Sequence, residues 1–438
     1  MLSFSNAYML PHAASETRTA GGRKDSDQRL RVLVLTAYRW PTTTRMAHAL
    51  SGTGAEVEAL CPAGHTLMRA NCVARTYRYD PLTPLRSLRR AITKSKPNLI
   101  IPTDDLIAAN VHKLFHLTNA DDFAGDSLRS LIARSLGGWK DYSTFYVRSE
   151  IARLAQTAEV FTPPVRTIAS CSDLLNQLRI LGYPSVLKTD GSSGGAGVAI
   201  VHNELEAKRA FTRLSGSPNF LLTLKRLIVD GDANLVLPCL RRVQPDVSIQ
   251  PYVAGRLANI AVACWEGSVL GQVCVEVLSS NGETGPATVV RIISHAGMSQ
   301  AAEKMVGLLK LSGLCGFDFI LDSENAAHLI DFNPRATQTC HLMPPDAKQP
   351  LASLISKLGG PQISEAYKTP HDGPIVLFPH GFLSEKDGPY SEHASKDLPA
   401  ESTEFVTFGL EYRRKRSRLL VRAIRNLSKK LGGGSSRK

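Results

Sequence analysis

Several common features are missing from this sequence. No run of roughly eighteen apolar residues occurs in the 438 residues, so we expect no membrane-spanning helix. The first residues lack a basic segment followed by a continuous apolar core, which predicts a disordered tail over residues 1–28 rather than a signal peptide. The eight cysteines form no C-x-x-C pair and mostly lie in apolar runs, so we expect reduced buried thiols in a cytoplasmic protein, not disulfides or a zinc site.

A large excess of positive over negative charge is also missing from most of the chain. The formal net charge is +13, but residues 411–438 hold eleven Lys and Arg against one Glu, which leaves only +3 elsewhere. This distribution does not predict a nucleic-acid groove, and no specific nucleic-acid partner is expected. Apolar residues in the segment recur at helical spacing among basic ones, which predicts a basic amphipathic helix and a flexible tail: Leu420, Ile424, Leu427 and Leu431. Such a helix could lie on an anionic membrane surface, bind an acidic partner, or remain solvated.

Residues 29–125 alternate between β-rich apolar runs and helical segments. This order predicts an α/β domain with a parallel, doubly wound sheet. The turn after the first strand, AYRWPTTTR, has no G-x-G-x-x-G, which argues against a dinucleotide site. Asp104 and Asp105 follow a predicted strand end, where they could contact a ligand or cap the next helix.

A lysine and a glycine-rich loop follow the predicted strand Ser185–Leu187. Because Val198–Val201 reads as another strand, the loop is the tip of a β-hairpin and not a Walker loop, which would lead into a helix. Backbone N–H groups of such a loop can wrap phosphate oxygens, and Lys188 adds a positive charge. The alternative is a flexible surface loop. The glycines are Gly191, Gly194, Gly195 and Gly197.

A predicted strand at Ser248–Val253 leads into a short connector. Its backbone could bind the edge of an adenine ring, with contacts from Gln250, Tyr252 and Val253. Three β-rich runs then predict an antiparallel sheet: Leu257–Trp265, Val269–Leu278 and Ala287–Ile293.

The stretch CGFDFILDSENAAHLIDFNPR predicts two strands joined by a tight turn at Asp322–Ala326. Period-two alternation puts Asp331 and Asn333 on one face, and the turn brings Asp318 opposite Asp331. Two carboxylates and an amide oxygen are good Mg²⁺ ligands, especially where phosphate oxygens complete the shell. The alternative is an exposed hairpin with incidental acidic residues.

In order and spacing these motifs resemble the ATP-grasp superfamily, on the side of biotin carboxylase and the carbamoyl-phosphate synthetase domains, over roughly residues 30–345. YPSVLKTDGSSGGAGVAIV resembles its phosphate-binding lysine and glycine-rich flap, and IQPYVAG its adenine-contacting hinge. GFDF with LIDFNPR resembles its metal-binding carboxylates, asparagine and phosphate-facing arginine. More narrowly, GPATVVR and NPRATQTCHL are similar to uncharacterised bacterial carboxylate–amine ligase-like members.

The resemblance implies an α/β architecture. A Rossmann-like preATP-grasp domain would occupy residues 29–125, followed by a two-lobed α+β ATP-grasp domain at 126–370. Its lobes would span about 145–250 and 251–370. A C-terminal extension at 371–410 and the basic segment at 411–438 complete the predicted organisation.

The resemblance also implies an ATP- and Mg²⁺-dependent ligase, with Mn²⁺ as an alternative metal. It would activate a small carboxylate as an acylphosphate for attack by an amine; a carboxylase or phosphotransferase using the same clamp is the rival enzyme. Arg335 and Arg291 would steady the transferred phosphate, and Asp318, Asp331 and Asn333 would bind the metal. The nucleotide would contact Arg148, Lys188, Gly191, Gly194, Gly195, Gly197, Gln250, Tyr252 and Val253. The oligomeric state is not predicted.

The chain departs from the family pattern at several positions. Arg148 falls where the family usually has lysine, and Asp331 where glutamate is common. Gln250 and Asn259 lie where acidic residues are frequent. These departures leave a second hypothesis open: a catalytically weak nucleotide-binding protein that acts as a scaffold or sensor, peripheral at the inner membrane face.

Two residues beside the motif could carry chemistry. Cys340 and His341 follow the arginine of FNPR closely, but no partner at a recognisable spacing supports catalysis. We therefore interpret both as packing residues.

Overall fold

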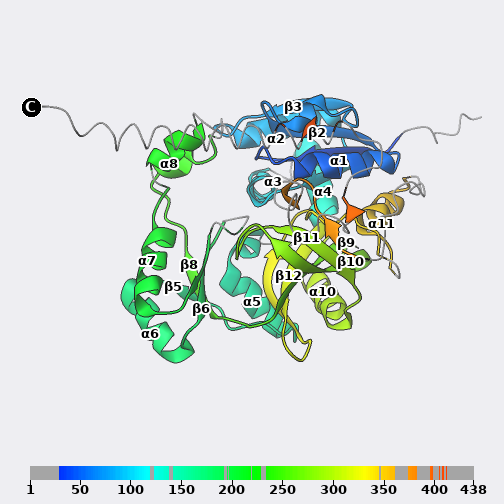
Figure 1. Ribbon diagram of the computed structural model, residues 1–438. Coiled ribbons are helices and arrows are strands. Elements are labelled where there is room, and N and C mark those ends of the chain that lie inside the picture. Colours follow the sequence, from blue (N-terminus) through cyan, green and yellow to red (C-terminus); the bar gives the residue numbers. More distant parts are fainter. Residues whose placement is uncertain are drawn as a thin grey trace, which may run out of the picture.

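The computed structural model describes residues 29–118, 123–137, 142–191, 195, 197–218, 220–227, 233–344, 347–360, 373–381, 395–397, 404, 407, 408 and 411, and the account below concerns these residues. Three β-sheets organise them (Figure 1). Within these ranges, no helix is both long and apolar enough to cross a lipid bilayer. The predicted tail at 1–28, Gly194 and nearly all of the predicted basic helix lie outside the described residues.

The N-terminal unit is a parallel four-stranded sheet, as predicted, in the order β3-β2-β1-β4. Its central strands are almost wholly buried because helices cover one face while α1 and a second sheet cover the other. The strands are β1 (Arg31–Leu35), β2 (Glu56–Pro62), β3 (Arg75–Tyr79) and β4 (Leu99–Pro102). The helices are α1 (Thr42–Gly52), η1 (Thr66–Arg69), α2 (Pro84–Ser95), α3 (Asp105–Leu117) and α4 (Phe123–Leu136).

The small lobe is an antiparallel sheet in the order β5-β8-β6-β7, covered by α6 and α7. The predicted glycine-rich hairpin joins β6 to β7, with Lys188 paired to Val198. The strands are β5 (Arg166–Ile168), β6 (Ser185–Thr189), β7 (Val198–Val201) and β8 (Val247–Pro251). The helices are α6 (Cys171–Leu181), α7 (Glu204–Ser215), α8 (Phe220–Lys225) and α9 (Val236–Leu240). Upstream lie η2 (Tyr142–Tyr146) and α5 (Arg148–Thr157).

The large lobe holds a seven-stranded sheet in the order β13-β12-β9-β10-β11-β14-β15, in which only β14 and β15 pair in parallel. Helices α5 and α10 pack on one face, and α11 with the N-terminal unit packs on the other. The strands are β9 (Arg256–Trp265), β10 (Ser268–Ser280), β11 (Ala287–Ile293), β12 (Gly313–Leu321), β13 (Ala327–Asn333), β14 (Ile375–Val376) and β15 (Ser395–Lys396). The helices are α10 (Ala296–Leu309) and α11 (Pro350–Lys357).

The N-terminal unit and the large lobe share one hydrophobic core. Val34 and Met46 belong to the same buried cluster as Val275 and Leu351. Helix α4 packs with α2 and α3 on the far face of the parallel sheet, which favours a domain boundary after Leu136 rather than at residue 125. The other predicted boundaries remain predictions.

Candidate functional site

The β12–β13 hairpin has the predicted geometry. Asp318 pairs directly with Asp331 across the two strands, and the Asp322 N–H donates to the Ala326 carbonyl in the turn (3.1 Å). Asn333 donates from Nδ2 to Asp318 Oδ2 at 3.1 Å. The two carboxylates and the amide therefore lie together, as the alternation and the turn predict.

These side chains face a cleft of about 650 Å³ between the two lobes and the N-terminal unit. Most of the predicted site residues line it: Arg148, Lys188, Gly195, Gln250, Tyr252, Val253, Asp318, Asp331, Asn333 and Arg335. Gly191 lines an adjoining pocket with Arg148. The buried Gly197 closes the hairpin by accepting a hydrogen bond from the Thr189 N–H at 2.9 Å.

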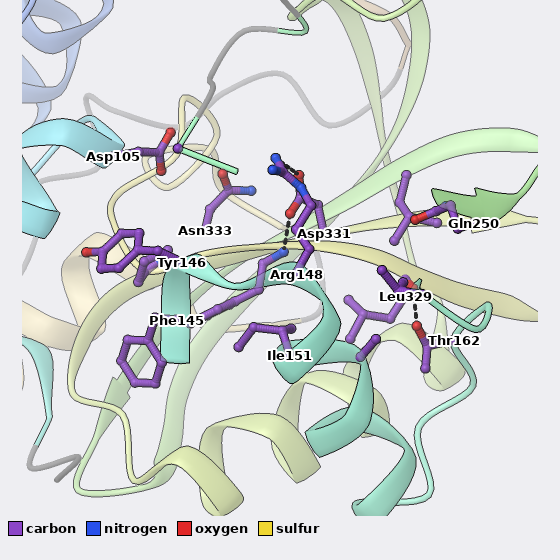
Figure 2. A pocket seen from close by; sticks show the side chains of 16 residues that line it. Asp105, Phe145, Tyr146, Arg148, Ile151, Thr162, Gln250, Leu329, Asp331 and Asn333 are labelled. Carbon is purple, nitrogen blue, oxygen red and sulfur yellow. Dashed lines mark hydrogen bonds and ion pairs between the residues drawn. The ribbon is translucent and has the colours of Figure 1, made fainter. Parts of the chain in front are cut away.

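Arg148 lies at the start of α5, where it bridges the lobes. Its guanidinium donates to the Thr189 carbonyl and to Asp190 Oδ1 (3.3 Å) of the small lobe. It also reaches Asp331 Oδ2 of the large lobe at 3.3 Å (Figure 2). Burial alone would raise the pKa of Asp331, but the charges of Arg148 and Lys188 outweigh it and lower the pKa. Asp331 is therefore held as a carboxylate.

Lys188 is buried at the end of β6 and donates from Nζ to the Ile330 carbonyl at 2.8 Å. Burial lowers its pKa, while Asp331 and Asp318 act in the opposite direction. For Asp318, burial raises the pKa to about 6, and the charge of Asp331 adds to this shift. A cation placed between the two groups would favour the ionised form of Asp318 beside the carboxylate of Asp331.

Arg335 forms a two-point ion pair with Asp105. Nε lies 2.7 Å from Oδ1, and Nη2 lies 3.1 Å from Oδ2. Nη2 also donates to Asn333 Oδ1 at 2.9 Å. The end of the predicted metal site is thus tied to the first turn of α3 in the N-terminal unit.

The predicted connector joins the lobes where β8 ends and β9 begins. Gln250 is buried in β8, paired with Val186 of β6, and Tyr252 is partly exposed beside it. A Cβ added to Gly255 would lie 2.2 Å from the Leu321 carbonyl oxygen, so any other residue in the connector would clash with the end of β12 at this point. Apolar side chains complete this end of the cleft: Val186, Ile200, Leu257 and Ile320.

The glycine-rich loop touches the large lobe. Thr284, in the turn between β10 and β11, donates from Oγ1 to the Gly195 carbonyl at 3.2 Å. Gly195 has a φ of 78°, and a Cβ there would lie 1.8 Å from the Thr284 carbonyl oxygen. Gly195 and Thr284 both line the cleft, and only glycine permits this contact between them.

Two candidate residues, Arg291 and Asp104, do not line the cleft. Arg291 does not line the cleft; it pairs with Glu276 at 2.6 Å on the other face of the large sheet, so we leave it out of the proposed site. Asp104 caps α3, accepting from the Ile107 N–H at 2.9 Å and from the Ala37 N–H at 2.7 Å. Of the two roles left open for Asp104, the structure shows the helix cap.

The sequence carries no signal for one partner, Asp190, and for Asp105, named above as a possible ligand contact or helix cap, it carries no signal for the pairing with Arg335. Asp190 follows directly after β6 and binds Arg148, but no pattern in the sequence marks it. Asp105 follows a strand end, a recognisable position, yet its partner Arg335 lies 230 residues away.

Comparison with known proteins gives the fold. No protein-family model matches the chain. The carbamoyl phosphate synthase large chains of Thermotoga petrophila and Thermotoga maritima are each 24% identical over 332 residues, covering 70% of this chain and 27% of theirs. The chain thus spans about a quarter of the length of these relatives.

Two solved structures match along most of both chains. N5-carboxyaminoimidazole synthetase from Staphylococcus aureus, complexed with ADP, has a TM-score of 0.51 at 13% identity and covers 77% of this chain and 79% of its own. N5-carboxyaminoimidazole synthase from Aspergillus clavatus, with ADP and 5-aminoimidazole ribonucleotide, has a TM-score of 0.53 at 13% identity, with coverages of 76% and 78%. The chain has the ATP-grasp fold, which confirms the fold predicted from the sequence.

Proposed function

We propose that the protein is an ATP- and Mg²⁺-dependent ligase that joins a small carboxylate to an amine. One observation carries this proposal: Lys188, Arg148 and the Asp318–Asp331–Asn333 group meet in a single cleft between two hinged lobes. A basic pair beside hard oxygen ligands suits a nucleotide triphosphate that carries its own metal. The two solved relatives named above are both complexes with ADP, which supports a nucleotide in this cleft.

The residues of the cleft divide into three roles. The connector from Gln250 to Gly255, with its apolar neighbours, would hold the adenine. Lys188, Arg148 and the N–H groups of the glycine-rich loop would hold the phosphates. Because the loop contacts Thr284 across the cleft, it would also keep water from the transferred phosphate.

The donor set fits a hard divalent cation. Asp318 and Asp331 face each other, and burial together with the charge of Asp331 raises the pKa of Asp318. Asn333 supplies a third oxygen once its amide turns from Asp318. Mg²⁺ bound there would neutralise charge that develops on the phosphate oxygens.

The reaction then needs positioning more than a nucleophilic side chain. The carboxylate of the substrate attacks the γ-phosphorus, ADP leaves, and an acylphosphate forms. The amine attacks the acyl carbon and phosphate departs. Arg335 lies beside Asn333 and would steady the transferred phosphate, exchanging its contact with Asp105 for one with the anion.

Other enzymatic functions of the same cleft would give different products. A carboxylase would require bicarbonate, and a phosphotransferase would release no free phosphate. The scaffold hypothesis predicts nucleotide binding without turnover, and the comparisons lend it no support.

A screen for ADP release over paired carboxylates and amines tests the proposal. We expect release only with both substrates present, and its loss in Lys188→Ala and Asp331→Ala. Glu324→Ala, which removes an exposed carboxylate from the turn of the same hairpin, is the matched control. Nucleotide binding with no turnover under any pairing would contradict the ligase function.

A further inference from the structure

A buried charged cluster lies on the wall of the cleft away from the predicted metal ligands. His341 and Asp397 are 4% and 3% exposed, and His341 Nε2 lies 2.6 Å from Asp397 Oδ1. Arg45 of α1 binds the same Asp397 oxygen through Nε (3.0 Å) and Nη2 (2.9 Å). Gln349 fixes the backbone by donating to the His341 carbonyl at 2.7 Å. The imidazole is thus held by Asp397, which Arg45 of the N-terminal unit holds in turn.

The hydrogen bonds determine which nitrogen of His341 carries the proton. Burial would raise the pKa of Asp397, but Arg45 and His341 outweigh it and lower the pKa, so Asp397 is a carboxylate that only accepts. Burial lowers the pKa of His341, the charge of Arg45 adds to this, and Asp397 opposes it. A neutral imidazole beside a carboxylate places its proton on Nε2. The lone pair is then on Nδ1.

His341 Nδ1 is a buried polar atom with no hydrogen-bond partner among the described residues. The neighbouring Thr339 Oγ1 is in the same state, and both residues line the cleft. Buried polar atoms without partners are rare in folded proteins and call for an explanation, such as a catalytic role or a bound water or ion. Three other threonines line the same cleft: Thr42, Thr43 and Thr103.

We propose that His341, oriented by Asp397, is the general base that takes a proton from the attacking amine. This inference rests on the proposed ligase function and names a catalytic residue within it. The amine nitrogen forms a bond to the acyl carbon of the acylphosphate, the carbon–oxygen bond to phosphate breaks, and phosphate leaves with the electron pair. The proton lost by the amine goes to Nδ1, and Asp397 stabilises the resulting imidazolium. The acceptor is thus an amine that reaches the part of the cleft lined by His341.

The protonation state can be measured without any substrate. Nitrogen NMR of the full-length protein with ¹⁵N-labelled histidines, assigned by comparison with His341→Gln, is expected to show His341 neutral at pH 7 with the proton on Nε2. In Asp397→Asn the side-chain amide can donate to Nε2 and move the proton to Nδ1. A His341 that is charged at pH 7, or protonated on Nδ1 in the wild type, would overturn the assignment whether or not the protein is a ligase.

Turnover separates a base from a structural histidine. With a carboxylate that supports ADP release, ammonium and hydroxylamine serve as acceptors; hydroxylamine is unprotonated near neutral pH and strongly nucleophilic, so its attack depends less on an enzyme base, and its proton can pass to water after the attack. We expect His341→Gln and Asp397→Asn to lose about 100-fold or more in kcat with ammonium and little with hydroxylamine. Equal losses with both acceptors, or no loss with ammonium, would refute the role. Failure of the wild type with both acceptors would instead count against the ligase function.

Discussion

Arg148 and Asp331 lie 183 residues apart in the sequence, and Nη2 of the arginine is 3.3 Å from Oδ2 of the aspartate. The resemblance of the sequence to ATP-grasp proteins predicts departures at these two positions, where lysine and glutamate are usual. In the structure the two side chains form one ion pair.

The pair predicts a coupled response to substitution. Arg148→Lys and Asp331→Glu each change the reach of one partner and are expected to weaken Mg·ADP binding about tenfold, whereas the double variant recovers part of the loss. The coupling free energy should be about 1 kcal/mol, as for contacting residues in one charged network. Calorimetric titration of the four proteins measures it. Strictly additive losses would show that the residues act independently.

Gly195 is expected to be essential for the loop contact. In Gly195→Ala the new methyl group collides with the Thr284 carbonyl oxygen, so the loop cannot cover the cleft and nucleotide affinity falls. Gly191→Ala is the matched control because Gly191 also has a positive φ (69°) but no atom within 4 Å of an added Cβ. Comparable losses of Mg·ADP affinity in both variants would mean that backbone strain alone, and not the collision with Thr284, causes the loss.

The Arg335–Asp105 pair should stabilise the contact between the N-terminal unit and the large lobe. Asp105→Ala leaves the guanidinium of Arg335 without its carboxylate partner in a largely buried position. We expect the free energy of unfolding to fall by about 3 kcal/mol. Urea unfolding, followed by near-ultraviolet circular dichroism, gives this value. An unchanged urea midpoint would mean that the pair contributes little to the contact.

For Arg291, unlike the residues of the cleft, we expect no effect on nucleotide binding. Since it pairs with Glu276 on the other face of the sheet and is half exposed, Arg291→Ala should leave Mg·ADP affinity unchanged. Its ion pair with Glu276 should contribute about 1 kcal/mol or less to stability. A large drop in nucleotide affinity, measured in the same calorimetric series, would return Arg291 to the site.

The local patterns of the sequence were enough to predict the hairpins that carry the site. Alternation over 317–333 and the polar turn gave the pairing of Asp318 with Asp331, and the glycines after Lys188 gave the β6–β7 hairpin. Both depend on residues close together in the chain, where periodicity and turn chemistry determine the register.

The remaining contacts of the site could not be predicted in this way. Arg335 reaches Asp105 across 230 residues, and His341 reaches Asp397 across 56. Such pairs exist only because the N-terminal unit and the C-terminal strands pack against the large sheet. For Arg291, the family resemblance indicated the cleft, but strand β11 turns the side chain toward Glu276. From the sequence, His341 is interpreted as a packing residue because the sequence does not show that Asp397 lies beside it.

The most direct test of the account is a calorimetric titration of ADP into the wild-type protein, Lys188→Ala and Asp331→Ala, each with and without Mg²⁺. We predict that Mg²⁺ strengthens ADP binding by the wild type, that Asp331→Ala abolishes this metal effect, and that Lys188→Ala weakens binding in both conditions. A wild-type protein that binds no nucleotide, or an Asp331→Ala variant that keeps the full metal effect, would contradict the assignment of the cleft as a Mg·ATP site.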